Sequence, residues 1–364
     1  MSLKVLFIGQ YDVSLNISIA ELELICGLSQ KPDITIDVFA PFNTESLRLL
    51  NDSGVNTIPG KLPEGFDLQF IESIKTLQAD HEYDIIHCYH SRILRHVIFA
   101  IKRTPVKLVT YLGAMSVHWH DPTAYFSFLN PRVDAVICNS RRVLTHFKKQ
   151  FFGKSKTKAH LIYKGYSTAW FDDITAIDRE SMNIPDKALM VTLAGTYSKV
   201  KGIEYFIKSQ QYLPEDLSIY YVIMGHGTDS KTLKDLVLQM PFPDRIQLLG
   251  YREDAKRIVK ASDIYAQTSL KEGFGRSLSE AVSMAKPVII TKTVGFSEVI
   301  ETEVSGLIIP PKQPRAIAEA IVKLKNATFR QQMGLKAKTH FEQHFNSQNT
   351  IDKTYQLYQS LINE

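Results

Sequence analysis

Residues 263–291 read DIYAQTSLKEGFGRSLSEAVSMAKPVIIT and decide the fold class. The short apolar pattern DIYAQT is followed by a loop with two glycines, then by a helical pattern, then by a second apolar run, KPVIIT. A strand, a helix and a second strand in this order indicate a parallel sheet covered by helices.

The same alternation extends along the chain in both directions. The expected strands are 4–9, 34–40, 83–88, 106–112, 134–138 and 159–163 in the first half, and 188–195, 217–225, 245–250, 263–268, 286–291 and 306–310 in the second. Helical patterns lie between strands, at 15–29, 67–80, 140–151, 202–211, 229–239, 253–260, 277–285 and 314–326.

The alternation breaks in a polar, irregular stretch between about 165 and 186. We therefore expect an α/β protein of two tandem, doubly wound Rossmann-like domains, 1–165 and 166–345, with a ligand cleft between them. After about 327 only helical patterns remain, so residues 346–364 are expected to form a terminal helix that crosses back to the first domain.

Composition narrows the class of protein. The chain has 364 residues, of which 44% are hydrophobic, too many for intrinsic disorder. No apolar run approaches the roughly 18 to 20 residues of a membrane-spanning helix, and the opening residues lack the pattern of a signal peptide. Three cysteines far apart in apolar patterns argue against disulfides and against a zinc cluster. We expect a cytoplasmic protein.

The net charge of +5 is unevenly distributed. Residues 1–90 hold 5 Lys/Arg against 13 Asp/Glu, whereas residues 91–164 hold 14 against 2. Within this basic part, residues 140–158 combine an apolar helical stripe with lysines and arginines. Such a helix packs on a sheet with solvated cations, or it attaches the protein to the anionic inner face of the cytoplasmic membrane. No nucleic-acid-recognition module is present, so nucleic acid is not an expected partner.

The loop EGFGRSLSE, residues 272–280, carries the chemistry. Gly273 and Gly275 allow a tight turn into a helix, whose first N–H groups and dipole favour an anion such as phosphate. Glu272 and Glu280 can face one site and accept hydrogen bonds from sugar and ribose hydroxyls. Taken alone, the loop also fits an ordinary helix N-terminus whose acids complement the dipole.

Other ligand motifs are missing. Gly9 follows the first expected strand without the further glycines of a dinucleotide fingerprint, which argues against NAD. The chain has no GxxxxGK[ST] loop, no HExxH and no Asp-x-Asp pair. A metal ion is therefore not expected, and neither is another cofactor.

Several linked motifs follow one another in the second half: AGTYSKVKGIEYFI, MGHG, LLGYREDAKRIVKASDIY, EGFGRSLSEAVSMAKPVIITKTVGFSEVI with its Glu-x7-Glu spacing, and SGLIIPPKQPRAIAEAI. In this order they resemble the donor-binding half of retaining family 4 glycosyltransferases of GT-B fold. The resemblance covers about residues 189–326 and implies the GT-B fold.

The resemblance also implies roles for single residues. Lys201 matches the lysine that contacts the donor diphosphate, Glu272 the acid near the donor sugar hydroxyls, and Glu280 the acid that binds the ribose. Tyr251 and Arg252 occupy the loop that meets the base. The remaining positive potential for the leaving diphosphate is expected from the backbone amides of Gly275, Arg276 and Ser277.

One departure concerns the leaving group. Thr196 stands where the family usually has Arg, so one of two cations is missing. Lys199 and Arg276 lie in the same loops and are candidates to replace it.

The first half resembles the family more loosely, through YDIIHC, DAVICNSRRV and HLIYKGYSTAWF, and the resemblance implies that it is the acceptor-side domain. Lys164 stands where Asn is common, and the glycine-rich loop is reduced to Gly9. After the strand VKLVTYLG, the residues His118, His120 and Asp121 are candidates for a place near the reacting carbon. A local, structural role for each His remains open, and His87 and His90 are expected to be structural.

The resemblance implies transfer of a sugar from a nucleoside diphosphate donor to a hydroxyl of a glycan or glycolipid, of lipopolysaccharide, capsule or exopolysaccharide type. It further implies retention at the anomeric carbon. Two alternatives stay open, a sugar-nucleotide-binding subunit without turnover and a sugar-nucleotide epimerase on the same fold.

Overall fold

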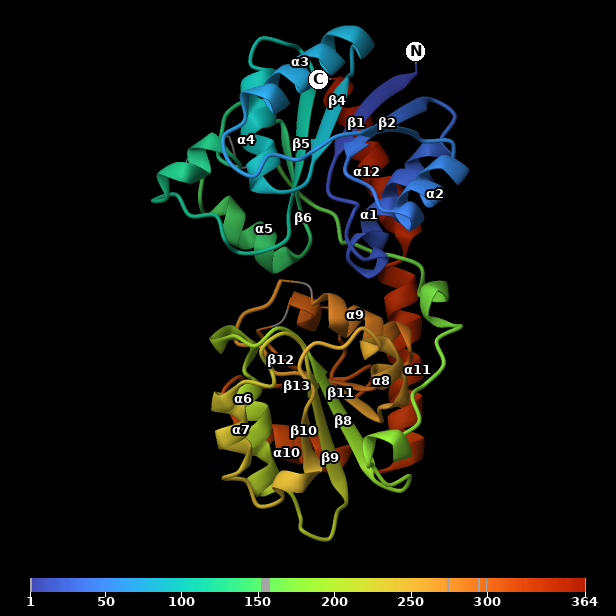
Figure 1. The fold of residues 1–364 in the computed structure, drawn as a ribbon, viewed down its shortest axis with the longest axis vertical. Coiled ribbons are helices and arrows are strands. Elements are labelled where there is room, and N and C mark those ends of the chain that lie inside the picture. The colour runs from blue at the N-terminus through green and yellow to red at the C-terminus, as the bar shows by residue number, and fades with distance from the viewer. Residues whose placement is uncertain (1, 152–157, 274, 294, 299, 364) are drawn as a thin grey trace. The chain divides into compact units, whose positions relative to one another are not determined.

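The computed structural model describes residues 2–151, 158–273, 275–293, 295–298 and 300–363 (Figure 1). The chain divides into two compact units. Unit 1 comprises Met1–Tyr166 and Phe345–Glu364, and unit 2 comprises Ser167–His344. This division lies one residue from the expected domain boundary and one residue from the expected start of the terminal segment.

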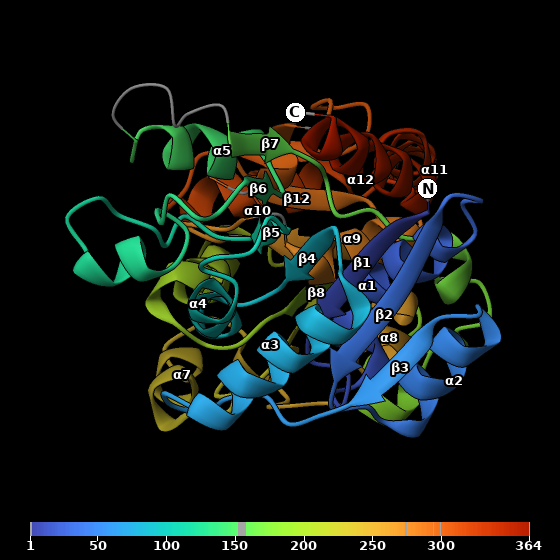
Figure 2. The ribbon, with the colours of Figure 1, turned by 90° about the horizontal axis from the view of Figure 1, so that it is seen from above.

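Unit 1 contains a parallel sheet with the strand order β3-β2-β1-β4-β5-β6-β7 in its described residues. Figure 2 shows β1, β2 and β3 side by side. The strands are β1 (Leu3–Ile8), β2 (Ile34–Ala40), β3 (Asn56–Pro59), β4 (Ile85–Cys88), β5 (Lys107–Leu112), β6 (Ala135–Cys138) and β7 (Ala159–Leu161).

Helices cover both faces of this sheet. Successive side chains of a strand point to opposite faces, so the apolar residues of each strand need cover on both sides. In β1, Val5 and Phe7 pack into one core and Leu6 and Ile8 into another. The first core includes side chains of α1 (Leu15–Ser29), α2 (Thr44–Asp52) and α12 (Ser347–Ile362). The second includes α3 (Leu68–His81), α4 (Ser91–Ala100) and α5 (Arg141–Lys148).

The strand β3 and the end of α5 differ from the sequence-based expectation. Asn56–Pro59 is short, half-exposed and at the edge of the sheet, so it lacks the buried apolar run that identifies a central strand. The helix expected over 140–151 ends at Lys148 and a turn follows at Lys149 and Gln150, although Phe151 continues the apolar stripe and packs against the core.

The terminal helix α12 completes unit 1. Ile351, Leu357 and Tyr358 are buried against α1 and β1. Gly27 of α1 permits the close approach, since a Cβ atom there would lie 2.1 Å from Cδ1 of Ile351. Lys31 Nζ also forms an ion pair with Asp352 Oδ1 at 2.9 Å. The return of residues 346–364 to the first domain is therefore seen in these contacts.

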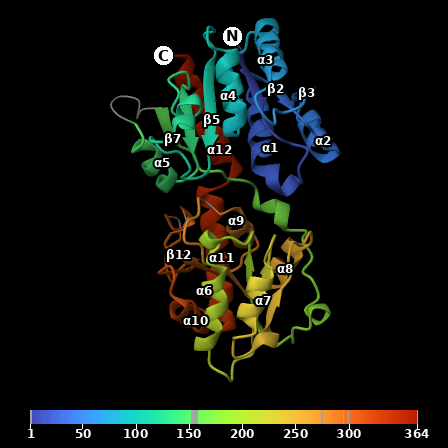
Figure 3. The ribbon, with the colours of Figure 1, turned by 60° about the vertical axis from the view of Figure 1, so that its left-hand side comes forward.

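Unit 2 contains a parallel sheet with the order β10-β9-β8-β11-β12-β13 in its described residues. The strands are β8 (Leu189–Ala194), β9 (Ile219–Met224), β10 (Ile246–Leu248), β11 (Ile264–Gln267), β12 (Val288–Thr291) and β13 (Leu307–Ile309). The helices, visible in Figure 3, are α6 (Ile203–Lys208), α7 (Lys231–Val237), α8 (Ala255–Ala261), α9 (Arg276–Ser283), α10 (Pro314–Lys323) and α11 (Ala327–His344).

Two expectations from composition can be compared with the structure. Cys26, Cys88 and Cys138 are free thiols, as expected. Within the described ranges, every helix is too short or too polar to cross a bilayer.

Candidate active site

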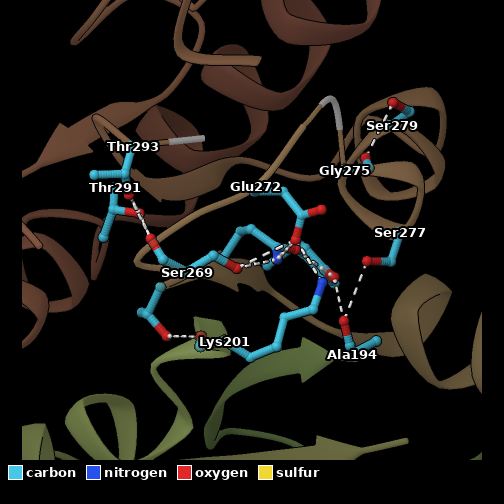
Figure 4. Close-up of polar contacts among 12 residues, drawn as sticks. Ala194, Lys201, Ser269, Glu272, Gly275, Ser277, Ser279, Thr291 and Thr293 are labelled. Atoms are coloured by element: carbon cyan, nitrogen blue, oxygen red, sulfur yellow. Dashed lines mark hydrogen bonds and ion pairs between the residues drawn. The ribbon is translucent and has the colours of Figure 1, made fainter. Parts of the chain in front are cut away.

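The candidate site of unit 2 lies where the order of its strands reverses. β8 and β11 are neighbours, and the chain leaves them in opposite directions across the sheet. Ligands of open parallel sheets bind outside the carboxyl ends of strands at such a point. Ala194 ends β8 and Gln267 ends β11, so the loops that follow them form the site (Figure 4).

An ion pair between Lys201 and Glu272 joins these loops. Lys201 Nζ lies 2.5 Å from Glu272 Oε2, and the two side chains are 25% and 18% exposed. The same carboxylate oxygen accepts longer hydrogen bonds from Gln267 Nε2 and from Ser269 Oγ, each at 3.4 Å. A charged pair held by further donors in a half-buried position is well oriented for a polar ligand.

The backbone around Gly202 fixes the position of Lys201. Gly202 has φ +66°, and a Cβ atom there would lie 2.2 Å from the carbonyl oxygen of Thr268. Thr268 Oγ1 donates to the carbonyl oxygen of Gly202 at 3.1 Å, and the N–H of Leu270 donates to that of Val200 at 2.7 Å. The turn that carries Lys201 is thus bound directly to the loop that carries Glu272.

Two threonines support this loop, one at the end of β12 and one two residues beyond it. The hydroxyls of Thr291 and Thr293 both donate to the carbonyl oxygen of Ser269 at 2.5 Å, and the N–H of Gly295 donates to that of Glu272 at 3.3 Å. Figure 4 shows Thr291 and Thr293 next to Ser269. Neither these supporting threonines nor Gln267 was predicted from the sequence as part of the site.

The start of α9 has the geometry expected for an anion site. Gly275 is the N-cap residue with φ +88°, and no side chain caps the helix there. Ser277 Oγ donates instead to the carbonyl oxygen of Ala194, at 3.1 Å. The first N–H groups of a helix have no partner within it, so those of Arg276 and Ser277 can bind an anion.

Glu280 lies one turn further along α9 and is half-buried. Burial raises the pKa of this carboxyl, although the nearby charges of Lys256 and Arg276 act in the opposite direction. Burial also disfavours the charged form of Lys256 and therefore lowers its pKa. The ammonium of Lys256 lies 4.9 Å from the ring centre of Phe171. Lys256 is a neighbour of Glu280 that no sequence motif indicated.

The loop after β10 presents an aromatic ring. Tyr251 is 58% exposed and stacks on His226 with ring centres 4.5 Å apart and 13° between the planes. Arg252 is oriented by Asp254, because its Nε and Nη2 each donate to a carboxylate oxygen of Asp254 at 2.7 Å. This bidentate pair raises the pKa of Arg252 and lowers that of Asp254.

Thr196 lies in the exposed loop after β8. That loop is packed against the loop after β9, where Gly225 has φ +133° and a Cβ atom would lie 2.2 Å from the carbonyl oxygen of Gly195. The two candidate replacements for the missing arginine, Lys199 and Arg276, are both exposed.

The candidate residues of unit 1 make local contacts. The ring of His118 stacks on that of His120 at 5.3 Å and meets the edge of His146 at 5.0 Å. Asp121 caps the following turn, accepting from the N–H and the hydroxyl of Thr123 at 2.9 and 2.8 Å, and these bonds lower its pKa. These contacts are of the kind expected if the histidines of this loop have a local, structural role.

Gly9 and the expected structural histidines can also be placed. A Cβ atom at Gly9 would lie 2.5 Å from the hydroxyl oxygen of buried Tyr11, so the close contact of this ring requires glycine. His87 is buried and its Nδ1 is 2.6 Å from the hydroxyl of Tyr358. His90 is exposed and has the unusual φ of +68°.

The basic segment 140–158 is described only in part. Val143 and Phe147 of α5 are buried in the core of unit 1, as the sheet-packing alternative requires. Lys154 and Lys156 lie outside the described residues. Among the described residues, no group of three or more His, Cys, Asp or Glu side chains is arranged to hold a metal ion.

Comparison with known families covers both units. Residues 175–340 match the family model described as glycosyl transferases group 1, and residues 22–170 match that of glycosyltransferase family 4. The chain belongs to the group 1 glycosyltransferases of family 4. The family resemblance of residues 189–326 is thereby confirmed, and so is the GT-B fold.

Two curated relatives illustrate the range of the family. The chain is 26% identical over 295 residues to an uncharacterized glycosyltransferase of Methanocaldococcus jannaschii, MJ1607, with 76% of this chain and 75% of the relative covered. It is 23% identical over 312 residues to the UDP-Gal:alpha-D-GlcNAc-diphosphoundecaprenol alpha-1,3-galactosyltransferase of Escherichia coli, with 81% and 80% covered.

Solved structures share the fold of this glycosyltransferase. Anabaena Alr3699/HepE in complex with UDP and glucose superposes with a TM-score of 0.78 at 20% identity, covering 98% of this chain and 100% of that one. A glycosyltransferase of Rickettsia africae ESF-5 gives a TM-score of 0.80 at 17% identity, covering 99% of each chain.

Proposed function

We propose that this glycosyltransferase transfers a sugar from a UDP-sugar to a hydroxyl of a glycan or glycolipid acceptor, with retention of the anomeric configuration and without a metal ion. The observation that carries the proposal is the ion pair of Lys201 with Glu272 beside the uncapped start of α9. The UDP complexes of Alr3699/HepE and the UDP-Gal donor named for the Escherichia coli relative favour uridine as the base.

The site offers one group for each part of such a donor. The ammonium of Lys201 and the amides of Arg276 and Ser277 would bind the diphosphate and stabilise the charge that develops as it leaves. Glu272 would accept hydrogen bonds from the sugar hydroxyls, and Glu280 from the ribose. A charge-assisted hydrogen bond of this kind contributes about 1.5 to 3 kcal/mol.

Retention follows from attack on the face that the diphosphate leaves. The acceptor hydroxyl forms the new glycosidic bond while the bond to the diphosphate breaks, and the departing diphosphate takes the hydroxyl proton. Lys201 would stabilise the diphosphate both while it leaves and after it has left as UDP. The proposal therefore requires no metal ion.

Transfer from labelled donors tests this function. UDP-glucose and UDP-galactose carrying a radiolabelled sugar are incubated with the protein and a glycolipid extract, and labelled product or slow donor hydrolysis is measured. Lys201→Met is expected to lower kcat by about 10²- to 10³-fold, as removal of one transition-state donor does. Glu272→Ala should also abolish turnover.

Lys208→Met is the matched control, because Lys208 is an exposed lysine on the helix that follows Lys201. UDP binding without transfer or hydrolysis would support the alternative of a binding subunit. The reason for this alternative is that Thr196 stands where the family usually has Arg. Conversion of the donor with no acceptor present would support an epimerase. Loss of activity in EDTA would contradict the proposal that no metal ion is needed. A coupling constant of the anomeric proton that shows the opposite configuration in the product would contradict retention.

A further inference from the structure

Unit 1 has a hollow of about 640 Å³ at the carboxyl ends of β1, β2 and β4. Gln10 and Asp12 follow β1, Pro41 follows β2, and His90 follows β4. The order of strands in this sheet also reverses at β1, which has β2 on one side and β4 on the other. The hollow thus lies at the point where a parallel sheet of this type binds its ligand.

The side chains around this hollow carry charges of both signs. Lys61 comes from the loop after β3, and Arg92 and Arg95 from the first turns of α4. Asp12 and Glu64 are the two carboxylates of the lining. All five side chains are exposed.

The cations of the hollow are not neutralised by its acids. Among the residues that the structure describes, none of Lys61, Arg92 and Arg95 forms an ion pair with Asp12 or Glu64. Arg92 Nη1 donates one hydrogen bond to the carbonyl oxygen of Pro63 at 3.4 Å, and Arg95 Nε donates one to that of Ser91 at 3.4 Å. Since a guanidinium has five N–H donors in a planar fork, each retains donors for a phosphate or carboxylate.

His90 adds an independent feature to the same hollow. It has φ +68°, a region that non-glycine residues occupy at a cost of about 1 to 2 kcal/mol. Its side chain makes no capping bond to α4. The core of the sheet does not need the imidazole, because this residue is exposed.

We infer that this hollow binds a hydroxylated acceptor through an anionic group, a phosphate or a carboxylate. Lys61, Arg92 and Arg95 bind the anion, and Asp12 and Glu64 accept hydrogen bonds from the hydroxyls. A neutral glycan leaves the three cations unmatched and binds more weakly. That the bound molecule is an acceptor rests on the proposed function. Binding of the anion can be measured without sugar transfer.

Ligand binding to the full chain tests the inference. Saturation-transfer NMR compares glucose 1-phosphate, glucuronic acid and methyl glucoside in the presence of excess UDP, which occupies the nucleotide site of unit 2. At least one of the two anionic sugars is expected to bind ten times or more tightly than methyl glucoside. Which one does so distinguishes a phosphate from a carboxylate acceptor.

Variants assign that binding to the hollow. The double variant Arg92→Gln/Arg95→Gln should weaken the anionic sugar at least tenfold and leave the affinity for UDP unchanged, with Lys61→Gln as a second, single-site variant. Lys75→Gln/Lys107→Gln removes the same charge from a different depression of unit 1 and should have no effect. Equal loss in this control, or anionic sugars that bind no better than methyl glucoside, would overturn the inference.

A vesicle experiment separates a soluble anion from a lipid surface. Phosphatidylglycerol vesicles that sediment the wild type but not the Arg92/Arg95 double variant, without binding of either soluble anionic sugar, would assign the cations to a membrane and overturn the acceptor site. If no donor supports transfer while the anionic sugar still binds through Arg92 and Arg95, the proposed function fails and the anion site remains.

Discussion

Glu280 combines a proposed ribose-binding position with a cost in stability. Its raised pKa means that the folded protein binds the proton more tightly than the unfolded chain does, because burial disfavours the carboxylate. The stability of the folded state therefore falls as pH rises through the pKa of Glu280. The neighbouring cations Lys256 and Arg276 reduce this cost without removing it.

Glu280→Gln is expected to separate the two roles. The neutral side chain avoids the burial of charge, so thermal unfolding at pH 7 should occur at the same temperature as in the wild type or a higher one. The difference should vanish below about pH 4, where the carboxyl of the unfolded chain is protonated too. The rise in melting temperature caused by UDP should shrink, because the ribose loses its acceptor.

Glu253→Gln provides the control, since Glu253 is exposed in the same unit. Differential scanning fluorimetry with and without UDP measures both effects. A variant Glu280→Gln that melts lower at pH 7 and keeps its full UDP response would show that the carboxylate serves the fold instead.

At the scale of elements, the turn before α6 depends on a glycine whose replacement has two separate costs. Gly202→Ala forces an alanine to φ +66° and places its Cβ atom 2.2 Å from a backbone oxygen. Gly54→Ala meets only the first cost, since Gly54 has φ +73° and no atom within 4 Å of the added Cβ. We expect Gly54→Ala to reduce the free energy of unfolding by about 1 kcal/mol.

Gly202→Ala is expected to cost at least about 3 kcal/mol, because the backbone of Thr268 must also move. UDP affinity should fall with it, because the same turn carries Lys201. Urea unfolding and UDP titration of the two variants measure these effects. Equal destabilisation by both substitutions would show that the loops after β8 and β11 separate easily and do not hold Lys201 in place.

Most strands and the candidate site residues of unit 2 could be predicted from the sequence because their signals are local. The glycines and acids of EGFGRSLSE stand next to an apolar strand and open a helix, so their neighbours in space are their neighbours along the chain. Thr291 and Thr293 gave no such signal, because they support Ser269 from positions more than 20 residues further along the chain. Lys256 was missed for the same reason, because its neighbour Glu280 lies more than 20 residues further along the chain. Asp254 lies only two residues from its partner Arg252, but the sequence does not reveal that these two side chains turn toward each other.

On the scale of the whole molecule, each unit has its own hydrophobic core and its own sensitivity to conditions. UDP should stabilise unit 2, which contains the proposed nucleotide site. Acid should act on unit 1 through His87, which is only 1% exposed and whose ring centre lies 4.9 Å from those of Phe7 and Tyr89. Calorimetry can therefore assign an unfolding transition to each unit by these two perturbations.

Burial lowers the pKa of His87 to about 3, whereas the unfolded chain titrates near 6.5. As pH falls between these values, the unfolded chain binds a proton that the folded unit cannot accept, so stability is lost. From pH 7 to pH 5 the loss is about 2 kcal/mol, at 1.36 kcal/mol for each pH unit below 6.5. His87→Phe keeps an aromatic ring in the stack and removes this titration.

The variant His87→Phe is expected to be less stable than the wild type at pH 7, since the Tyr358 hydroxyl loses its partner, yet less sensitive to acid. His120→Asn, which changes an exposed histidine of the same unit, should leave the pH dependence unaltered. Urea unfolding of all three proteins at pH 7 and pH 5 measures the slopes. An unchanged slope in His87→Phe would mean that other groups of unit 1 take up the protons that are bound on unfolding, and that the buried histidine does not set its acid sensitivity.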